Sequence, residues 1–395
     1  MPKIKPFKAL QYSAGKAWET LCCPPYDVVS EKQQRELEAR NAYNAIRLER
    51  PADGYQKAAE RLAEWRAEGV LAQSAEPAYY MLEMDFTSGG KNYVLRGFTA
   101  LMELTPFGEG QVLPHEETLS KAKEDRLALM RATNCNFSPI CGLYDDQTGE
   151  ARAALDAAAK LPPDAEFTMP DGVTHRFWSI KDIALQESLT RVVGGGPVFI
   201  ADGHHRYETS LNYCGRGGFI MITLVEMSDP GLVVLPTHRV VKGKVPENLI
   251  ENLKGVFRVE DADAMSEPPN GSLVFYHNGK AKLLTLTSPN AMDKLNASAA
   301  YKSLDVAILH SLILEPYFGI DKDAMAAQSR LTYTRDPSEA IKMVDEDAGQ
   351  CVFLLPPTKV SQIRGVSLAG EKMPQKSTYF YPKLITGITF NMLEK

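Results

Sequence analysis

The strongest constraint on the fold lies between residues 194 and 225, where two apolar runs flank a polar segment. The first run, 198–201, follows a glycine run and meets Asp202-Gly203, a pair typical of turns. The polar segment after it has helical length and ends near Gly215, and the second apolar run spans 219–225. The stretch therefore predicts a strand, a tight turn, a helix and a second strand.

The start of this helix is a candidate anion site. The first turn of a helix has unpaired backbone N–H groups and carries the positive end of the helix dipole. In this chain, His204, His205 and Arg206 open the helix. Such a helix start suits an anion, most obviously a phosphate.

The length and charge of the chain limit what it can be. With 395 residues, it is too long for one ordinary core, since single domains typically contain ~50–250 residues. Two or three packed units are therefore expected, and 44% hydrophobic with 24% charged residues is a globular composition. A net charge of −6 argues against a broad nucleic-acid-binding surface, so a phosphate-bearing ligand would need a focused site.

Cysteine spacing and hydropathy indicate the cellular setting. The six cysteines include no Cys-x-x-Cys pair, which argues against a structural zinc site. The amino terminus lacks the apolar core of a signal peptide, and no apolar run approaches the ~20 residues that span a bilayer. We expect a cytoplasmic protein with reduced thiols and no membrane or nucleic-acid partner, and no oligomeric state is predicted.

Other apolar patterns predict further elements. The runs 78–86 and 92–100 flank a Gly-rich connection, which is the pattern of a β-hairpin and marks the beginning of a sheet. The segment 136–144 is typical of another strand, and 41–49 is interpreted as a short strand.

Three polar segments stand out against this apolar background. Pro114 ends a strand-like run and places His115 and Glu116 at its end. Thr237-His238-Arg239 lies in an apolar strand context, where buried polar groups need partners, so a ligand contact and a structural network both stay open. The donor-rich tail, 373–384, either folds back to close a site or is a loose terminus.

This inventory of side chains suits phosphoryl transfer. Lysine and arginine neutralise charge on the transferring group, one carboxylate holds Mg²⁺, and another orients or deprotonates the attacking hydroxyl. The sequence has neither a Walker A lysine loop nor a Gly-x-Gly-x-x-Gly motif after a strand. The candidate site residues are His115, Glu116, Asp202, His204, His205, Arg206, Thr237, His238, Arg239, Lys376, Ser377 and Lys383.

The motifs also carry a resemblance. Asp202-Gly203-His204-His205-Arg206, between a strand and a helix, resembles the phosphate-binding motif of the ParB/sulfiredoxin superfamily. That superfamily includes chromosome-partitioning nucleotide hydrolases, sulfiredoxins and kinases that phosphorylate free L-serine. The wider pattern resembles a bacterial and archaeal family known as a domain of unknown function, through Pro24-Pro25-Tyr26-Asp27, Pro114-His115-Glu116-Glu117-Thr118, Asp125-Arg126, Ala201 to Glu208, Thr237-His238-Arg239 and Met373-Pro374-Gln375-Lys376-Ser377-Thr378.

The resemblance implies a fold and a division of the chain. It implies a mixed α+β protein with a ParB/sulfiredoxin-like nucleotide-binding core at 111–245. An elaborated α+β region, 1–110, would precede this core. A second α+β region, 246–395, would follow it, and its tail, 373–384, would return to the site.

The resemblance also implies roles for individual residues. Glu116 would be the catalytic base, and Asp202 and His205 would also act in catalysis, with Asp202 near Mg²⁺. It places ATP or another nucleotide at His204, His205 and Arg206. We further expect Gly203 and the tail residues Lys376, Ser377, Thr378 and Lys383 to bind the nucleotide, and the substrate to contact His115, Thr118, Thr237, His238 and Arg239.

The function that follows is an ATP- and Mg²⁺-dependent kinase for a small hydroxylated metabolite, with free L-serine as the leading acceptor. The alternatives are a ParB-like nucleoside triphosphate hydrolase or switch, and a non-catalytic nucleotide or metabolite sensor. Gly203 stands before His204, where sulfiredoxins carry their cysteine, so sulfinic acid reduction is not expected. The sequence also lacks a recognisable helix-turn-helix with a basic face, which argues against DNA partitioning.

Overall fold

The computed structural model describes residues 1–13, 15, 17–118, 120–288, 290–327 and 329–393. These residues form two compact units. The first unit consists of Met1–Pro114, Thr118–Val233 and Pro382–Lys395, and the second of His115–Glu117 and Val234–Tyr381. Both units combine helices with sheets, which confirms the predicted mixed α+β class.

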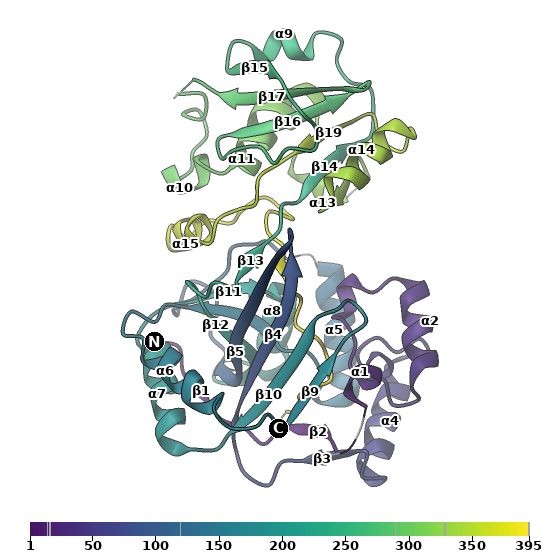
Figure 1. The fold of residues 1–395 in the computed structure, drawn as a ribbon, viewed down its shortest axis with the longest axis vertical. Coiled ribbons are helices and arrows are strands. Elements are labelled where there is room, and N and C mark those ends of the chain that lie inside the picture. Colours follow the sequence, from purple (N-terminus) through teal and green to yellow (C-terminus); the bar gives the residue numbers. More distant parts are fainter. Residues whose placement is uncertain (14, 16, 119, 289, 328, 394–395) are drawn as a thin grey trace. The chain divides into compact units, whose positions relative to one another are not determined.

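A nine-stranded sheet forms the centre of the first unit (Figure 1). Its strand order is β6-β11-β8-β12-β5-β4-β10-β9, and β1 also pairs with β5. In that order, the strands are Val112–Leu113, Val198–Asp202, Ile140–Tyr144, Phe219–Glu226, Lys91–Glu103, Tyr79–Ser88, Thr174–Ile180 and Ala165–Thr168, with β1 at Ile4–Lys5. The pairs β11–β6 and β12–β8 are parallel and the others antiparallel. Strands from the regions 1–110 and 111–245 therefore share one sheet.

The hairpin and the strand-turn-helix-strand stretch have the predicted form. Strands β4 and β5 are joined through Gly89 and Gly90, both at positive φ, as a tight hairpin turn requires. Strand β11, helix α8 (His204–Cys214) and strand β12 follow one another as expected.

Alternation along the strands gives this sheet two buried faces. In β5, Phe98, Ala100 and Met102 belong to the larger core cluster, whereas Leu101 belongs to a smaller cluster formed with the amino-terminal segment. Helices α6 (Glu150–Ala158) and α7 (Ile183–Gly194) add apolar side chains to the larger core and lie side by side (Figure 1). The sheet is therefore covered rather than exposed on that face.

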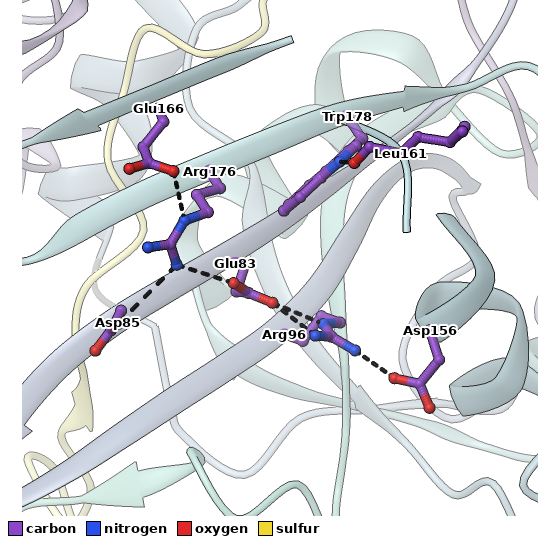
Figure 2. Close-up of polar contacts among 8 residues, drawn as sticks. All are labelled: Glu83, Asp85, Arg96, Asp156, Leu161, Glu166, Arg176 and Trp178. Atoms are coloured by element: carbon purple, nitrogen blue, oxygen red, sulfur yellow. Dashed lines mark hydrogen bonds and ion pairs between the residues drawn. The ribbon is translucent and has the colours of Figure 1, made fainter. Parts of the chain in front are cut away.

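A row of charged side chains crosses β10, β4 and β5 (Figure 2). Arg176, Glu83 and Arg96 occupy directly opposed positions on the three strands. The Glu83 carboxylate lies 3.1 Å from Arg176 Nη1 and 2.7 Å from Arg96 Nη2, and only 11% of its side chain is exposed. Asp156 of α6 and Glu166 of β9 pair with the outer sides of the two arginines. One buried carboxylate thus holds two guanidinium groups across three strands.

We expect Glu83→Gln to lower the free energy of unfolding of the first unit by about 1–3 kcal/mol, because it removes the charge that two partly buried arginines share. Urea unfolding followed by tryptophan fluorescence measures this, since Trp18, Trp65 and Trp178 all lie in the first unit. Asp85→Asn is the matched control. Asp85 lies on the same strand, 4.0 Å from Arg176 and 47% exposed, so its change should stay within about 0.5 kcal/mol. Equal effects of the two substitutions would contradict the account of the network.

The remaining elements of the first unit are short strands and helices. Helix α3 (Ile46–Glu49) shows that the short strand expected at 41–49 was wrong. The physical reason is Asn44, whose side-chain oxygen accepts the Ile46 N–H at 3.0 Å and starts a helical turn.

The other elements of the first unit are α1 (Trp18–Leu21), a 3₁₀ turn (Tyr26–Val28), α2 (Glu31–Arg40), α4 (Tyr55–Ala67), α5 (Ser120–Thr133), β2 (Leu10–Tyr12) paired with β3 (Leu71–Gln73), and β7 (Cys135–Asn136) paired with β21 (Asn391–Met392).

The second unit contains a six-stranded antiparallel sheet with the order β15-β17-β16-β19-β14-β18. In that order, its strands are Phe257–Asp261, Lys280–Leu286, Ser272–His277, Cys351–Leu354, His238–Val241 and Leu331–Thr334. Its helices are α9 (Leu249–Leu253), α10 (Ala299–Lys302), α11 (Asp305–Leu309), a π-helical turn (His310–Leu314), α12 (Glu315–Phe318), α13 (Lys322–Ala327), α14 (Pro337–Asp345) and α15 (Val360–Leu368). The strands β13 (Val233–Val234) and β20 (Phe380–Tyr381) lie where the chain passes between the units. Among the described helices of the whole chain, none is long and apolar enough to cross a bilayer.

Candidate functional site

The turn between β11 and α8 is built around Gly203. This residue has φ 94° and ψ 28°, in the left-handed region that favours glycine. A Cβ atom at this position would lie 2.6 Å from Ile140 Cγ2. Glycine therefore allows the strand to end and the helix to begin within one residue, which places Asp202 directly before the first turn of α8.

Two cations accompany the Asp202 carboxylate. Lys383 Nζ lies 3.1 Å and Arg206 Nη2 lies 3.8 Å from Asp202 Oδ2. Burial opposes the ionised form of Asp202, but Lys383 and Arg206 outweigh it and hold the pKa of that carboxyl well below its usual value. The carboxylate is therefore ionised at neutral pH and pairs with both cations.

A hydrogen bond from the guanidinium nitrogen that does not face Asp202 fixes the orientation of Arg206. Its Nη1 donates a hydrogen bond of 2.6 Å to the carbonyl of Pro139, just before β8. Burial opposes the charge of Arg206, while Asp202 and then Asp27 raise its pKa above the usual value. Arg206 is therefore a permanent, positioned cation between two strand ends and the Pro-Pro-Tyr-Asp segment.

A second buried arginine lies in the same region. The Arg126 guanidinium lies over the Tyr26 ring at 3.9 Å from its centroid and forms an ion pair of 3.2 Å with Glu49. Burial raises the pKa of Glu49 despite the nearby Arg126 and Arg206. A cavity of about 30 Å³ is lined by Glu49, Arg126 and Arg206 among others, which is room for a water molecule or two. The Pro-Pro-Tyr-Asp and Asp-Arg motifs thus meet the Asp202 motif in one charged region.

Thr118 also contacts the motif helix. Its hydroxyl donates a hydrogen bond to Glu208 of α8, and Lys123 Nζ lies 2.8 Å from the same carboxylate oxygen. His204 is buried, with 3% of its surface exposed, and His205 is half-buried. The first unit therefore brings together Thr118, the segment Asp202 to Arg206, and Lys383.

The other predicted residues belong to the second unit. His115 Nε2 lies 3.0 Å from Thr378 Oγ1, and the carbonyl of His115 accepts the Met373 N–H at 2.8 Å. The Pro-His-Glu segment and the tail are therefore joined in that unit, which also contains Glu116, Lys376 and Ser377. Ser377 Oγ donates to the Pro374 carbonyl, and Lys376 is exposed.

The Thr-His-Arg triplet is held by contacts within the second unit. Arg239 is 1% exposed and donates to the carbonyls of Thr237, Gln375 and Lys376. Burial lowers the pKa of Arg239 to about 10. His238 Nδ1 accepts the Leu355 N–H at 3.2 Å. These contacts form a structural network that supports the tail. Contact between the triplet and a ligand stays a prediction.

Sequence reasoning missed Glu49 as a residue of the charged region. The segment that contains it, 41–49, was interpreted as a short strand. The available signal was a lone carboxylate beside two buried apolar residues, since such a group needs a cationic partner.

Comparisons with known proteins place the chain in a family but do not name an activity. A family model described as "Protein of unknown function (DUF1015)" matches residues 4–307, and no curated protein matches the chain. Among solved structures, a conserved hypothetical protein from Pyrococcus furiosus is 14% identical, with a TM-score of 0.39 over 71% of this chain and 91% of that one. A free serine kinase mutant in complex with AMP is 12% identical, with a TM-score of 0.40 over 71% and 89%. SbnI with a C-terminal truncation, from Staphylococcus aureus, is 14% identical, with a TM-score of 0.38 over 71% and 84%. At these TM-scores the likeness is distant, so a function for this chain has to rest on its own residues.

Proposed function

Because the chain belongs to the DUF1015 family of proteins of unknown function, as its motifs predict, we propose a function from its own site. The proposed activity is transfer of a phosphoryl group from a nucleotide, with ATP as the leading donor, to a small hydroxylated metabolite, with free L-serine as the leading acceptor. The observation that carries the proposal is the placement of Lys383 and Arg206 next to the Asp202 carboxylate at the start of α8.

The charge of this site favours a phosphate group. Lys383 and Arg206 supply two positive charges beside the carboxylate of Asp202, and the eleven-residue helix α8 adds the positive end of its dipole. Only 12% of the Arg206 side chain and 15% of the Lys383 side chain are exposed, so solvent screens these charges weakly. A nucleotide phosphate at the start of α8 would be attracted by both cations and by the helix dipole.

Asp202 is the residue that would approach Mg²⁺. The described residues include no group of three or more His, Cys, Asp and Glu side chains that could hold a metal ion. Mg²⁺ commonly uses one or two carboxylates together with substrate phosphates and water. The donor set of this site therefore fits Mg²⁺ that arrives with the nucleotide, and the ion would neutralise charge on the transferring group.

The acceptor is supported by the motif resemblance rather than by geometry. The resemblance to kinases of free L-serine assigns Glu116 as the base that takes the proton of the serine hydroxyl. It also assigns His205 to catalysis and Lys376, Ser377 and Thr378 to the nucleotide. These roles are part of the proposal and are tested with it.

The direct test is incubation of the purified chain with ATP, Mg²⁺ and L-serine, with phosphorus NMR to detect O-phosphoserine. We expect product from the wild type and from Asp293→Asn, a control that neutralises an exposed carboxylate outside the site. We expect none above background from Asp202→Asn or Glu116→Ala. Release of inorganic phosphate without an acceptor would support the hydrolase alternative. Nucleotide binding without turnover would support the sensor alternative, and either outcome would overturn the kinase proposal.

A further inference from the structure

The second unit contains a cavity of about 420 Å³ that the proposed function does not use. Small-molecule sites typically have volumes of about 300–1,000 Å³, so the cavity has room for an organic ligand. Its charged and polar wall is formed mainly by Glu117, His310, Glu315, Asp321, Glu371 and Lys372. Two motif segments therefore reach this wall: Glu117 from the Pro-His-Glu-Glu-Thr motif, and the residues just before the Lys-Ser-Thr tail.

His310 is a buried polar side chain on this wall that lacks a partner. It is 6% exposed, and neither of its ring nitrogens has a hydrogen-bond partner among the residues that the structure describes. Leaving a buried donor or acceptor unpaired is energetically unfavourable. His310 also begins a π-helical turn, a rare interruption of a helix that is frequent at functional sites. A ligand in the cavity would supply the missing hydrogen bond.

The protonation state of His310 determines which hydrogen bonds its ring can form. Burial, and then the positive charge of Arg239, lower the pKa of His310 to about 3. The imidazole is therefore neutral at physiological pH and carries one donor and one acceptor nitrogen. Arg239 is not on the cavity wall and donates its own hydrogen bonds to backbone carbonyls.

The described residues of the wall include four carboxylates and one lysine. Glu371 accepts hydrogen bonds from the backbone N–H and the hydroxyl of Ser298, and Asp321 accepts the Ala324 N–H at 2.8 Å. The side-chain carboxylates of Glu117 and Glu315 form no hydrogen bond or ion pair within the described part of the chain. Among the described residues, two carboxylates are therefore uncommitted, which favours a positively charged ligand.

The geometry points to a binding site for a small organic cation with a primary ammonium group, held by Glu117, Glu315 and the buried His310 ring. A bare metal ion is a poorer fit, because no group of three or more metal-binding side chains is found in the described ranges. The apolar side chains of Ile320, Met325 and Met373 on the same wall suit the carbon chain of an amine.

Isothermal titration calorimetry of the full chain tests this, with putrescine and spermidine as the probes. The titrations use physiological ionic strength of about 0.15 M, at which unspecific surface attraction is screened. We expect saturable binding of at least one amine and no binding of 1,4-butanediol, which has the length of putrescine without its charges. We expect Glu315→Gln to weaken binding roughly tenfold or more, since a charge-assisted hydrogen bond is lost.

Glu267→Gln is the matched control, because Glu267 is an exposed glutamate of the same unit outside the cavity wall. It should bind the amines as the wild type does. His310→Gln should also weaken binding; if that variant does not fold, the exposed Glu315 still decides the question. Absence of binding by both amines, or equal loss in Glu315→Gln and Glu267→Gln, would overturn the proposal. Neither outcome depends on phosphoryl transfer, because the amine site and the Asp202 site use different residues.

Discussion

Replacing Lys383 with methionine is expected to lower kcat/KM for phosphoryl transfer by about 100-fold or more. Preorganised charges that face the transferring group commonly contribute factors of about 10²–10³. Lys383 lies 3.1 Å from Asp202 with 15% of its side chain exposed, so its charge acts at short range and with little screening. Methionine has similar length and no charge, and therefore separates the loss of charge from the loss of packing. Initial rates at varied ATP concentration measure the effect.

The matched control is Lys254→Met, which removes a lysine charge 55% exposed on the second unit. Its rates should equal those of the wild type. Calorimetric titration with ADP gives a readout that does not depend on the acceptor, and Lys383→Met should weaken ADP binding as well. Unchanged ADP affinity and unchanged rates in Lys383→Met would show that Lys383 is not part of the nucleotide site. Partial recovery in Lys383→Arg would identify charge as the property that matters.

The second large effect is expected from Gly203→Ala on the stability of the first unit. Two costs add at this position: a left-handed backbone that alanine adopts reluctantly, and a Cβ atom 2.6 Å from Ile140 Cγ2. The first costs about 1 kcal/mol, and overpacking in a buried position typically costs a further 1–3 kcal/mol. We expect the free energy of unfolding to fall by about 2–4 kcal/mol. Urea unfolding followed by tryptophan fluorescence reports on the first unit alone, because all three tryptophans lie in it.

Gly172→Ala separates these two costs. Gly172 has a similar φ of 86°, but a Cβ atom there would have no neighbour within 4 Å. Its substitution should therefore cost only the backbone part, about 1 kcal/mol. If both substitutions had the same effect, contact with Ile140 would not be the reason for a glycine at position 203.

The local part of the site could be predicted from the sequence. Asp202-Gly203 between an apolar run and a polar helical segment specifies a strand, a turn and a helix, because each signal acts over a few residues. The contact between Lys383 and Asp202 was not predicted, since the two residues are 181 positions apart and no local pattern relates them. The sequence indicated only that the tail with Lys383 returns to the site.

The parts that could not be predicted depend on long-range contacts. Glu49 lies in the charged region because the fold brings Arg126 and Arg206 close to it. The expected strand 136–144 is split into β7 and β8, and β7 pairs with a strand from the end of the chain. His115 belongs with the second unit although Thr118 belongs with the first, because Met373 binds the His115 carbonyl. None of these partners is visible in the neighbouring sequence.

The order in which the chain is made has a consequence for the candidate anion site. Residues 382–395 belong to the first unit, yet they are synthesised after the whole of the second. Lys383 therefore reaches Asp202 only after the ribosome has produced both sheets, and β21 pairs with β7 later still. Domains usually fold as units while they are made, with the amino-terminal one first. Here, Asp202 and Arg206 are synthesised long before Lys383. A nascent chain shorter than 383 residues therefore has an incomplete anion site.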